Sequence, residues 1–261
     1  MNSTVSTPLD VKLMNATALA LYGVLAFVVF VILAVWAMQS PIFAIQKITV
    51  IGDVAHTNAI TLRANVASGL RGSFITLDLA RARETFESVP WVRRAVVKRE
   101  FPNRLKVQLQ EHQAVAYWGA ESESRLLNDH GEVFEANTGE VEQEGLPRLN
   151  GPQGQGAQVL LVYQNLEPLF ADLDATLDQL ELTGRGSWLA RLDTGAVLQL
   201  GRGTPQDIVA RTERFVKTLP QITSTYGRRP EALESADLRH EGGYALRIRG
   251  VTTTEVIQKQ K

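Results

Sequence analysis

The hydrophobic residues of this chain form one long unbroken run near its start and shorter periodic runs after it. Residues 19–38 contain no charge, and twenty helical residues span about 30 Å, the thickness of a bilayer's hydrocarbon core. Tyr22 and Trp36 lie near the two ends of the run, where amphipathic rings favour the membrane interface. We therefore predict a membrane-spanning helix over residues 19–40, preceded by a short tail of residues 1–18.

Two other interpretations of this run are a cleaved secretory signal and a buried core helix. A secretory signal has an apolar region of about 7–15 residues behind several positive charges, whereas this run is longer and follows only Lys12, partly offset by Asp10. A soluble domain rarely needs a helix that is apolar on all faces. Pro41 ends the helix, since proline has no N–H to donate, and Lys12 favours a cytoplasmic tail.

Residues 41–112 alternate between strand and helix patterns. A β-branched run over residues 45–51 predicts a strand, Asn58 caps a helix that runs to Ser68, and a second helix opens at Leu77 and ends at Pro90. Residues 93–101 and 104–110 then form the clearest hairpin, because Leu105, Val107 and Leu109 alternate with polar residues. This order predicts a small α+β domain in which two helices cover one face of a three-stranded sheet.

Residues 113–250 contain three further hairpins and two helices. The hairpins are predicted at residues 126–134, 188–200 and 235–249, after a strand at residues 115–118. Val159 to Asp178 has the spacing of an amphipathic helix. A hinge is predicted at Gly151-Pro152, and an exposed acidic loop at residues 140–144. The second helix begins at Thr204-Pro205 and ends at Pro220, and residues 251–261 form a flexible tail.

Charge and cysteine content narrow the classes of function. The chain has no cysteine, so disulfides and thiolate metal sites are excluded. Residues 41–112 carry a net charge of +5, residues 113–181 a net charge of −11, and residues 182–261 a net charge of +5. Such blocks indicate domains with different partners. For the basic block, a solvated surface is favoured over nucleic-acid binding, because a domain beyond a membrane anchor meets no nucleic acid.

Motifs of catalysis and cofactor binding are absent from the sequence. His56, His112, His130 and His240 form no short metal-ligand pair, and the glycine-containing runs lack the lysine of a phosphate-binding loop. No nucleophile elbow is present. The sequence therefore predicts no catalytic residue, no metal ion and no cofactor.

Several motifs occur in an order that carries a family resemblance. Val89-Pro90-Trp91-Val92 is followed by Arg99-Glu100-Phe101-Pro102-Asn103-Arg104 and then by Glu111. This first part resembles the polypeptide-transport-associated (POTRA) domain of the FtsQ/DivIB family of bacterial cell-division proteins. Farther along, Leu200-Gly201-Arg202 and Asp237-Leu238-Arg239 resemble the β domain of the same family. His240 and Ile248 depart from the aromatic residues that members often have there, as Ala114 does from a proline.

The resemblance implies an α+β chain with a transmembrane helix, a POTRA domain over residues 41–112 and a mixed β-sheet domain over residues 113–250 with helices packed on it. It further implies a non-catalytic assembly protein at the division septum, single-pass in the bacterial inner membrane, with its two domains in the periplasm. The POTRA domain would contact other membrane-anchored division proteins. The β domain would bind the FtsB–FtsL pair.

The predicted contact is strand addition to the open edge of the last strand, residues 244–249. Main-chain bonds would supply affinity, and side chains along the strand and its preceding turn would supply selectivity. Two arginines on the preceding helix could grip an acidic group of the partner. The predicted partner-binding residues are Arg211, Arg214, Arg239, His240, Gly243, Tyr244, Ala245, Leu246 and Ile248.

Two alternatives from other classes remain open at this point. One is a membrane-anchored periplasmic enzyme that acts on cell-wall polymer, which would need a pocket with convergent polar groups and a perturbed acid. The other is a transport-associated chaperone that handles unfolded chains through the same small domain. A single copy of that domain argues against the chaperone.

Overall fold

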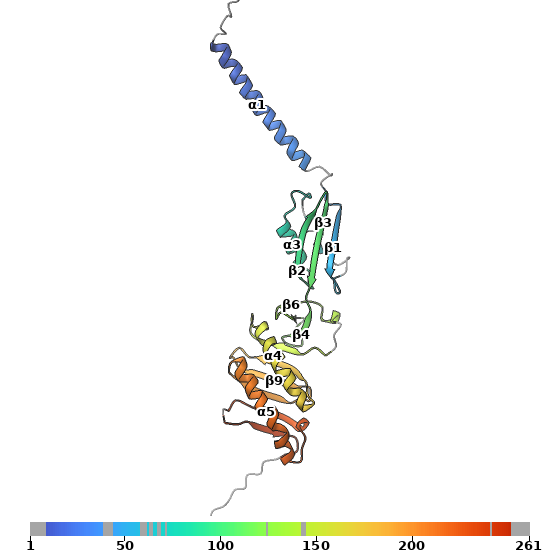
Figure 1. The fold of residues 1–261 in the computed structure, drawn as a ribbon, viewed down its shortest axis with the longest axis vertical. Helices are drawn as coiled ribbons and strands as arrows, with labels where there is room; N and C mark the ends of the chain where they lie inside the picture. The colour runs from blue at the N-terminus through green and yellow to red at the C-terminus, as the bar shows by residue number, and fades with distance from the viewer. Residues whose placement is uncertain are drawn as a thin grey trace, which may run out of the picture. The chain divides into compact units, whose positions relative to one another are not determined.

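The computed structural model describes residues 9–38, 44–57, 62, 65–66, 69–70, 72–123, 125–141, 145–240 and 242–251. The chain divides into two compact units, Met1–Glu111 and His112–Lys261. The predicted flexible tail, apart from Val251, and the helix-ending role of Pro41 lie outside the described residues. Figure 1 shows the elements in chain order.

The first element is a single long helix, α1, which spans Leu9–Met38. Its segment Leu13–Trp36 is long and apolar enough to cross a membrane, and none of that segment is buried against the rest of the protein. The apolar side chains are spread around all sides of the helix rather than gathered on one face. The helix begins ten residues before the predicted span, because the polar residues ahead of the apolar run continue its helical turns.

A three-stranded sheet forms the centre of the first unit. The strands are β1 (Lys47–Asp53), β2 (Val92–Glu100) and β3 (Arg104–Glu111), in the order β1-β3-β2. The predicted β2–β3 hairpin is confirmed, with Val97 opposite Val107, and β1 runs parallel to β3. Leu105, Val107 and Leu109 are buried while the residues between them are exposed, as the alternating pattern predicts.

The helical layer covers one face of this sheet. Helix α3 spans Leu79–Glu87, and the Asp78 side chain caps it by accepting N–H bonds from Ala80 and Arg81. It ends three residues before Pro90, so the predicted end is too late. Most of the helix predicted from Asn58 to Ser68 lies outside the described residues. The parts that are described, Leu62 and residues 65–66, are helical.

The second unit is built on a nine-stranded sheet of order β12-β11-β10-β9-β8-β7-β4-β5-β6. The predicted hairpins β5–β6, β9–β10 and β11–β12 are all confirmed. The strands are β4 (Ala114–Trp118), β5 (Arg125–Asn128), β6 (Val133–Glu135), β7 (Arg148–Asn150), β8 (Leu177–Leu182), β9 (Trp188–Leu192), β10 (Val197–Gly201), β11 (Leu233–Asp237) and β12 (Ala245–Ile248).

Two strands of this sheet were not predicted from the sequence. Strand β7 pairs in parallel with both β4 and β8, so the segment before Gly151-Pro152 is fixed in the sheet and the hinge prediction is wrong. Strand β8 begins at Leu177, inside the helix predicted to reach Asp178. The structure ends that helix early, because Asp174 adopts a left-handed conformation with φ of 51° after a short 3-10 turn.

Helices α4 (Gly156–Phe170) and α5 (Pro205–Thr225) lie side by side on one face of the large sheet (Figure 1). Thr204 and Asp207 form a capping box at the start of α5, as its sequence predicts. Pro220 does not end this helix. It continues to Thr225, and the buried Thr223 hydroxyl donates to the carbonyl oxygens of Leu219 and Pro220.

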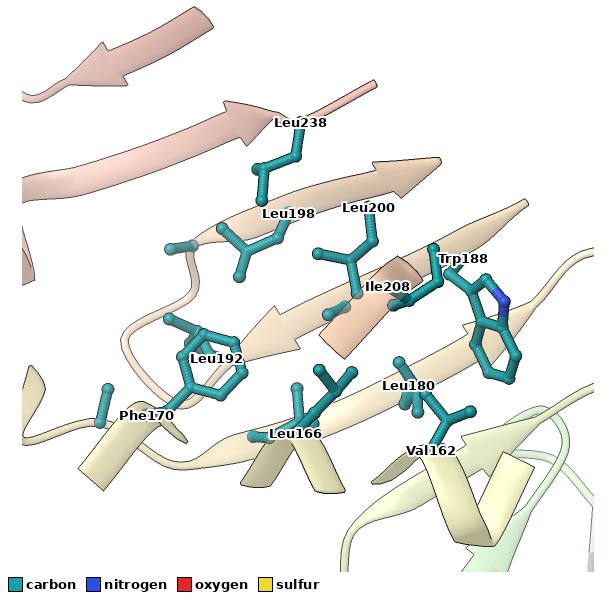
Figure 2. Packing of buried hydrophobic residues seen from close by; sticks show 14 of the residues in the cluster. Val162, Leu166, Phe170, Leu180, Trp188, Leu192, Leu198, Leu200, Ile208 and Leu238 are labelled. Atoms are coloured by element: carbon teal, nitrogen blue, oxygen red, sulfur yellow. The ribbon is translucent and has the colours of Figure 1, made fainter. Parts of the chain in front are cut away.

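The core of the second unit lies between these helices and the sheet. Figure 2 shows Val162, Leu166 and Phe170 of α4 facing side chains of the strands, with Ile208 of α5 beside them. Phe170, Ile208 and the strand residue Leu198 are completely buried. The opposite face of the sheet carries polar and partly exposed residues such as Gln199 and Arg191. The large sheet is therefore covered by helices on one face only, and the helical layer also supports its last strands.

One carboxylate joins the end of β3 to the loop after β1. The Glu111 side chain is 7% exposed and accepts N–H bonds from Ala55, His56 and Thr57 at 2.8–3.0 Å. Burial acts to raise the pKa of Glu111, but the hydrogen bonds from His56 and Thr57 outweigh it and hold the pKa below its ordinary value. The ionised form therefore stabilises the fold.

We expect Glu111→Gln to lower the free energy of unfolding by about 1–3 kcal/mol at pH 7, because charged hydrogen bonds to three N–H groups are replaced by weaker ones. A lowered folded pKa contributes stability above the unfolded pKa and loses it as the pH falls through the folded pKa. The difference between the two proteins should thus shrink below about pH 4. Urea unfolding of residues 44–261 at several pH values measures it, and an equal difference at pH 7 and pH 3 would contradict this account.

Candidate functional site

Strand β12 is the last strand at one end of the large sheet. It pairs antiparallel with β11, with Leu246 opposite Ala236 and Ala245 opposite Asp237. Within the described parts of the chain, no strand pairs with its other edge. Arg249 donates its N–H to the Ala232 carbonyl at 2.8 Å. Since alternate N–H groups of an antiparallel strand point to opposite sides, the N–H groups of Leu246 and Ile248 point to the unpaired edge.

The side chains of β12 hold it against the core on one face. Ile248 is buried, and Leu246 and Tyr244 pack partly buried against the core cluster of the unit. The Tyr244 ring meets Phe215 of α5 edge-on, with 5.3 Å between ring centroids, and the Tyr244 hydroxyl hydrogen-bonds Thr218 of α5. Helix α5 thus supports the strand from behind and leaves its outer backbone edge exposed.

A small hollow of about 220 Å³ lies between α5 and the turn that leads into β12. Five of the nine predicted site residues line it, and Ala245, Leu246 and Ile248 lie on the adjoining strand. Its described lining contains cations, a histidine and small residues but no carboxylate. The lining residues are Arg211, Arg214, Thr218, Leu238, His240, Gly242, Gly243 and Tyr244.

The two arginines of α5 have different surroundings. The Arg211 guanidinium donates to the carbonyl oxygens of Leu200 and Arg202 at the end of β10, so it ties the helix to the sheet. Gly201, with φ of +83°, makes room for this contact, because a Cβ there would lie 3.0 Å from Arg211 Nη1. Arg214 is exposed and forms no ion pair with any described residue. Arg214 is therefore the cation available to a ligand.

Arg239 is held by the carboxylate of Asp237, the last residue of β11. Its guanidinium donates to both carboxylate oxygens of Asp237, at 2.8 Å and 2.6 Å. These hydrogen bonds lower the pKa of Asp237 to about 2. Asp237 ends β11 and Arg239 follows it by two residues, a spacing that the sequence could have indicated. The predicted site missed Asp237 and also Thr218, whose hydroxyl gives no sequence signal.

Metal-ligating clusters are not part of this site. Among the described residues, no group of three or more histidines, aspartates or glutamates is placed to hold a metal ion. His240 is exposed beside the hollow, whereas His56 and His112 stack on Trp91 and Phe134 in other parts of the chain.

A helix long and apolar enough to span a membrane, a small three-stranded α+β unit and a second unit with a large sheet that ends in β12 and in β6 describe a class of two-domain proteins with a membrane-type helix. Comparison with known proteins gives the family. The family model described as "POTRA domain, FtsQ-type" matches residues 43–112, and the one described as "Cell division protein FtsQ/DivIB, C-terminal" matches residues 116–239.

Curated relatives agree with the family models over nearly the whole chain. A "Cell division protein FtsQ" of Thiomonas arsenitoxydans is 38% identical over 94% of this chain and 89% of its own length. One of Burkholderia pseudomallei is 38% identical over 93% of this chain and 94% of its own length. The protein belongs to the FtsQ/DivIB family of cell-division proteins, as its motifs predict.

We expect Tyr244→Phe to lower the free energy of unfolding by about 1 kcal/mol, because the hydroxyl bond between the start of β12 and Thr218 is lost while the ring contact with Phe215 remains. Tyr226→Phe is the matched control, since that ring is 57% exposed at the end of α5 and should change stability by less than about 0.5 kcal/mol. Urea unfolding compares them, and equal effects would contradict the role of the Tyr244 hydroxyl.

Proposed function

We propose that this protein is a non-catalytic assembly protein of the bacterial division machinery. Helix α1 would fix it in the inner membrane with residues 1–18 in the cytoplasm, and residues 41–112 and 113–250 would form two periplasmic domains at the septum. Family membership and the apolar segment Leu13–Trp36 support this. The lack of a carboxylate in the described lining of the hollow at β12 also favours binding over glycoside hydrolysis, which needs a pair of them.

The proposed mechanism is strand addition at β12, and the partner is the FtsB–FtsL pair. The observation that carries it is that β12 ends the sheet with outward N–H groups at Leu246 and Ile248 and no described strand on that side. A partner strand would continue the sheet through main-chain hydrogen bonds. Because α5 fixes β12 through Tyr244 before any partner arrives, little ordering of this edge is needed on binding.

Side chains around the edge would select the partner. Arg214 and His240 line the hollow beside the strand. An acidic residue of the partner, just after its added strand, could place its side chain in the hollow and pair with Arg214. Arg211 and Arg239 would act by holding the hollow's walls, since both are already bonded within the protein. Gly243 lies just before the strand, where an added Cβ would meet no atom of the protein within 4 Å, so this position is open to a partner.

The first unit would contact other membrane-anchored division proteins. Its sheet ends in β1 on one side and in β2 on the other, and sheet edges are templates for pairing. This part of the proposal rests on the matched POTRA family model and on those edges.

We expect Leu246→Pro to weaken binding of the FtsB–FtsL pair by more than about tenfold, because proline removes an outward N–H needed by an added strand. Proline is tolerated on an edge strand when its missing N–H faces outward, so circular dichroism should stay near normal. Leu246→Ala is the control, since it shortens the side chain but keeps the N–H. Full binding by the proline variant, or equal losses in both, would refute strand addition at this edge.

We expect Arg214→Ala to raise the Kd of the same complex by about fivefold, or about 1 kcal/mol, and to reduce its salt dependence. The control is Lys217→Ala on the same helix, because Lys217 already pairs with Glu213 at 2.6 Å and does not line the hollow. Binding titrations at low and high salt measure both. An unchanged Kd for the Arg214 variant would show that no acidic group enters the hollow.

A further inference from the structure

Among the described residues outside α1, the β2–β3 hairpin ends in the most exposed aromatic side chain. Phe101 is 83% exposed, and its ring stands edge-on to the buried Phe74, with 6.5 Å between ring centroids. Ile75, in the neighbouring loop, is 43% exposed. Arg99 donates to the carbonyl oxygens of Phe74 and Leu77 and so fixes this loop beside the tip. An apolar group is thus held out into solvent by a rigid support.

Cations line the face of the sheet that the helices leave open, at the same end of the sheet as this tip. Because Leu105 and Val107 face the core, Arg104 and Lys106 point to the open face. Lys98 lies directly opposite Lys106, and Lys47 lies beside Arg104. All four cations are exposed and form no ion pair with described residues. Glu100 is the one carboxylate among the residues that lie opposite them on the neighbouring strands.

Such an arrangement costs stability in the isolated domain. Like charges directly opposite each other on neighbouring strands repel, and a bare aromatic ring gains nothing from water. Both costs fall on the same end of the same sheet. The surface of an anionic membrane would offset both the charge repulsion and the exposure of the ring. Its headgroups attract the cations, and aromatic rings favour its interface.

The chain itself brings this end close to a membrane. Gln46 donates its N–H to the Asn103 carbonyl at 3.0 Å, so the hairpin tip lies at the end of the sheet where the chain enters β1. Only eight residues separate Met38, the last residue of α1, from Lys47, and they reach at most about 30 Å when extended. The tip is therefore confined within a short distance of the bilayer that α1 fits.

We propose that this end of the first unit is a membrane-docking surface for anionic phospholipid headgroups. Phe101 enters the interface, and Lys47, Lys98, Arg104 and Lys106 contact the headgroup phosphates. The proposal rests on α1 as a membrane anchor but not on strand addition at β12. Docking would hold the first unit at the bilayer surface. The end of its sheet opposite the hairpin tip, with the strand edges there, would remain available to protein partners.

The test uses the full chain in lipid nanodiscs with one environment-sensitive fluorophore. Because the chain has no cysteine, Asn103→Cys labels the hairpin tip alone. Gln110→Cys, at the other end of β3, is the control position, about 20 Å away along the strand. We expect a blue-shifted emission at position 103 when phosphatidylglycerol replaces part of the phosphatidylcholine, and no difference between the two compositions at position 110.

Charge variants identify the cause of the shift. The pair Lys98→Glu and Lys106→Glu should lower the ratio of docked to undocked protein by at least about fivefold for each cation lost. Arg94→Glu reverses the charge of one exposed residue at the other end of β2 and should leave the shift intact, whereas either lysine reversal alone should reduce it. If the double charge reversal perturbs folding, the glutamine pair replaces it, and Phe101→Ser tests the aromatic separately.

The proposal is overturned by an emission at position 103 that is the same in both lipid compositions, or by an Arg94→Glu variant that abolishes the shift as fully as the lysine pair. A shift that appears only after another division protein is added, and in either lipid, would also overturn it by assigning the surface to a protein. Loss of FtsB–FtsL binding with the lipid shift retained would concern the proposed function at β12 alone.

Discussion

A β-strand has two hydrogen-bonding edges, and β12 uses one of them. Its inner edge bonds to β11, Tyr244 just before it contacts Phe215 and Thr218 of α5, and Leu246 packs against the core of the unit. Those contacts hold the strand in place without help from a second neighbour. The remaining edge is then held in place and has no partner among the described strands, a combination that an isolated extended segment does not have. The hollow, the Arg214 guanidinium, which pairs with no described residue, and the bonded guanidinium groups of Arg211 and Arg239 are all arranged around that edge.

The surfaces proposed for the two units differ in chemistry. The first unit presents an aromatic tip beside cations that form no ion pair with described residues, and the second presents backbone groups beside a small cationic hollow. Lipid headgroups are recognised by charge and by partition of a ring into the interface, whereas another chain is recognised by register along a strand. The two surfaces therefore need not compete for the same ligand.

Much of the fold follows from local sequence patterns. The alternation of Leu105, Val107 and Leu109 predicts β3, and the hydroxyl-proline start at Thr204 predicts α5. The failures have tertiary causes. Leu173 and Leu177 keep helical spacing, but Leu177 reaches the core from a strand after the left-handed turn at Asp174. Strand β7 is too short for a periodic signal and exists because β4 and β8 both pair with it. Likewise, the sequence predicts that Arg211 and Arg214 act together on a partner. Only the structure shows that the Arg211 guanidinium is already hydrogen-bonded within the protein.

The even apolar surface of α1 bears on how the protein behaves as part of an assembly. No polar stripe runs along the helix, so the surrounding hydrocarbon meets a similar surface at every rotation about the helix axis. The bilayer then sets the depth of the anchor but exerts little torque on it. Azimuthal alignment of the anchored protein must come from contacts outside the hydrocarbon, which leaves the molecule free to swivel until a neighbour engages it.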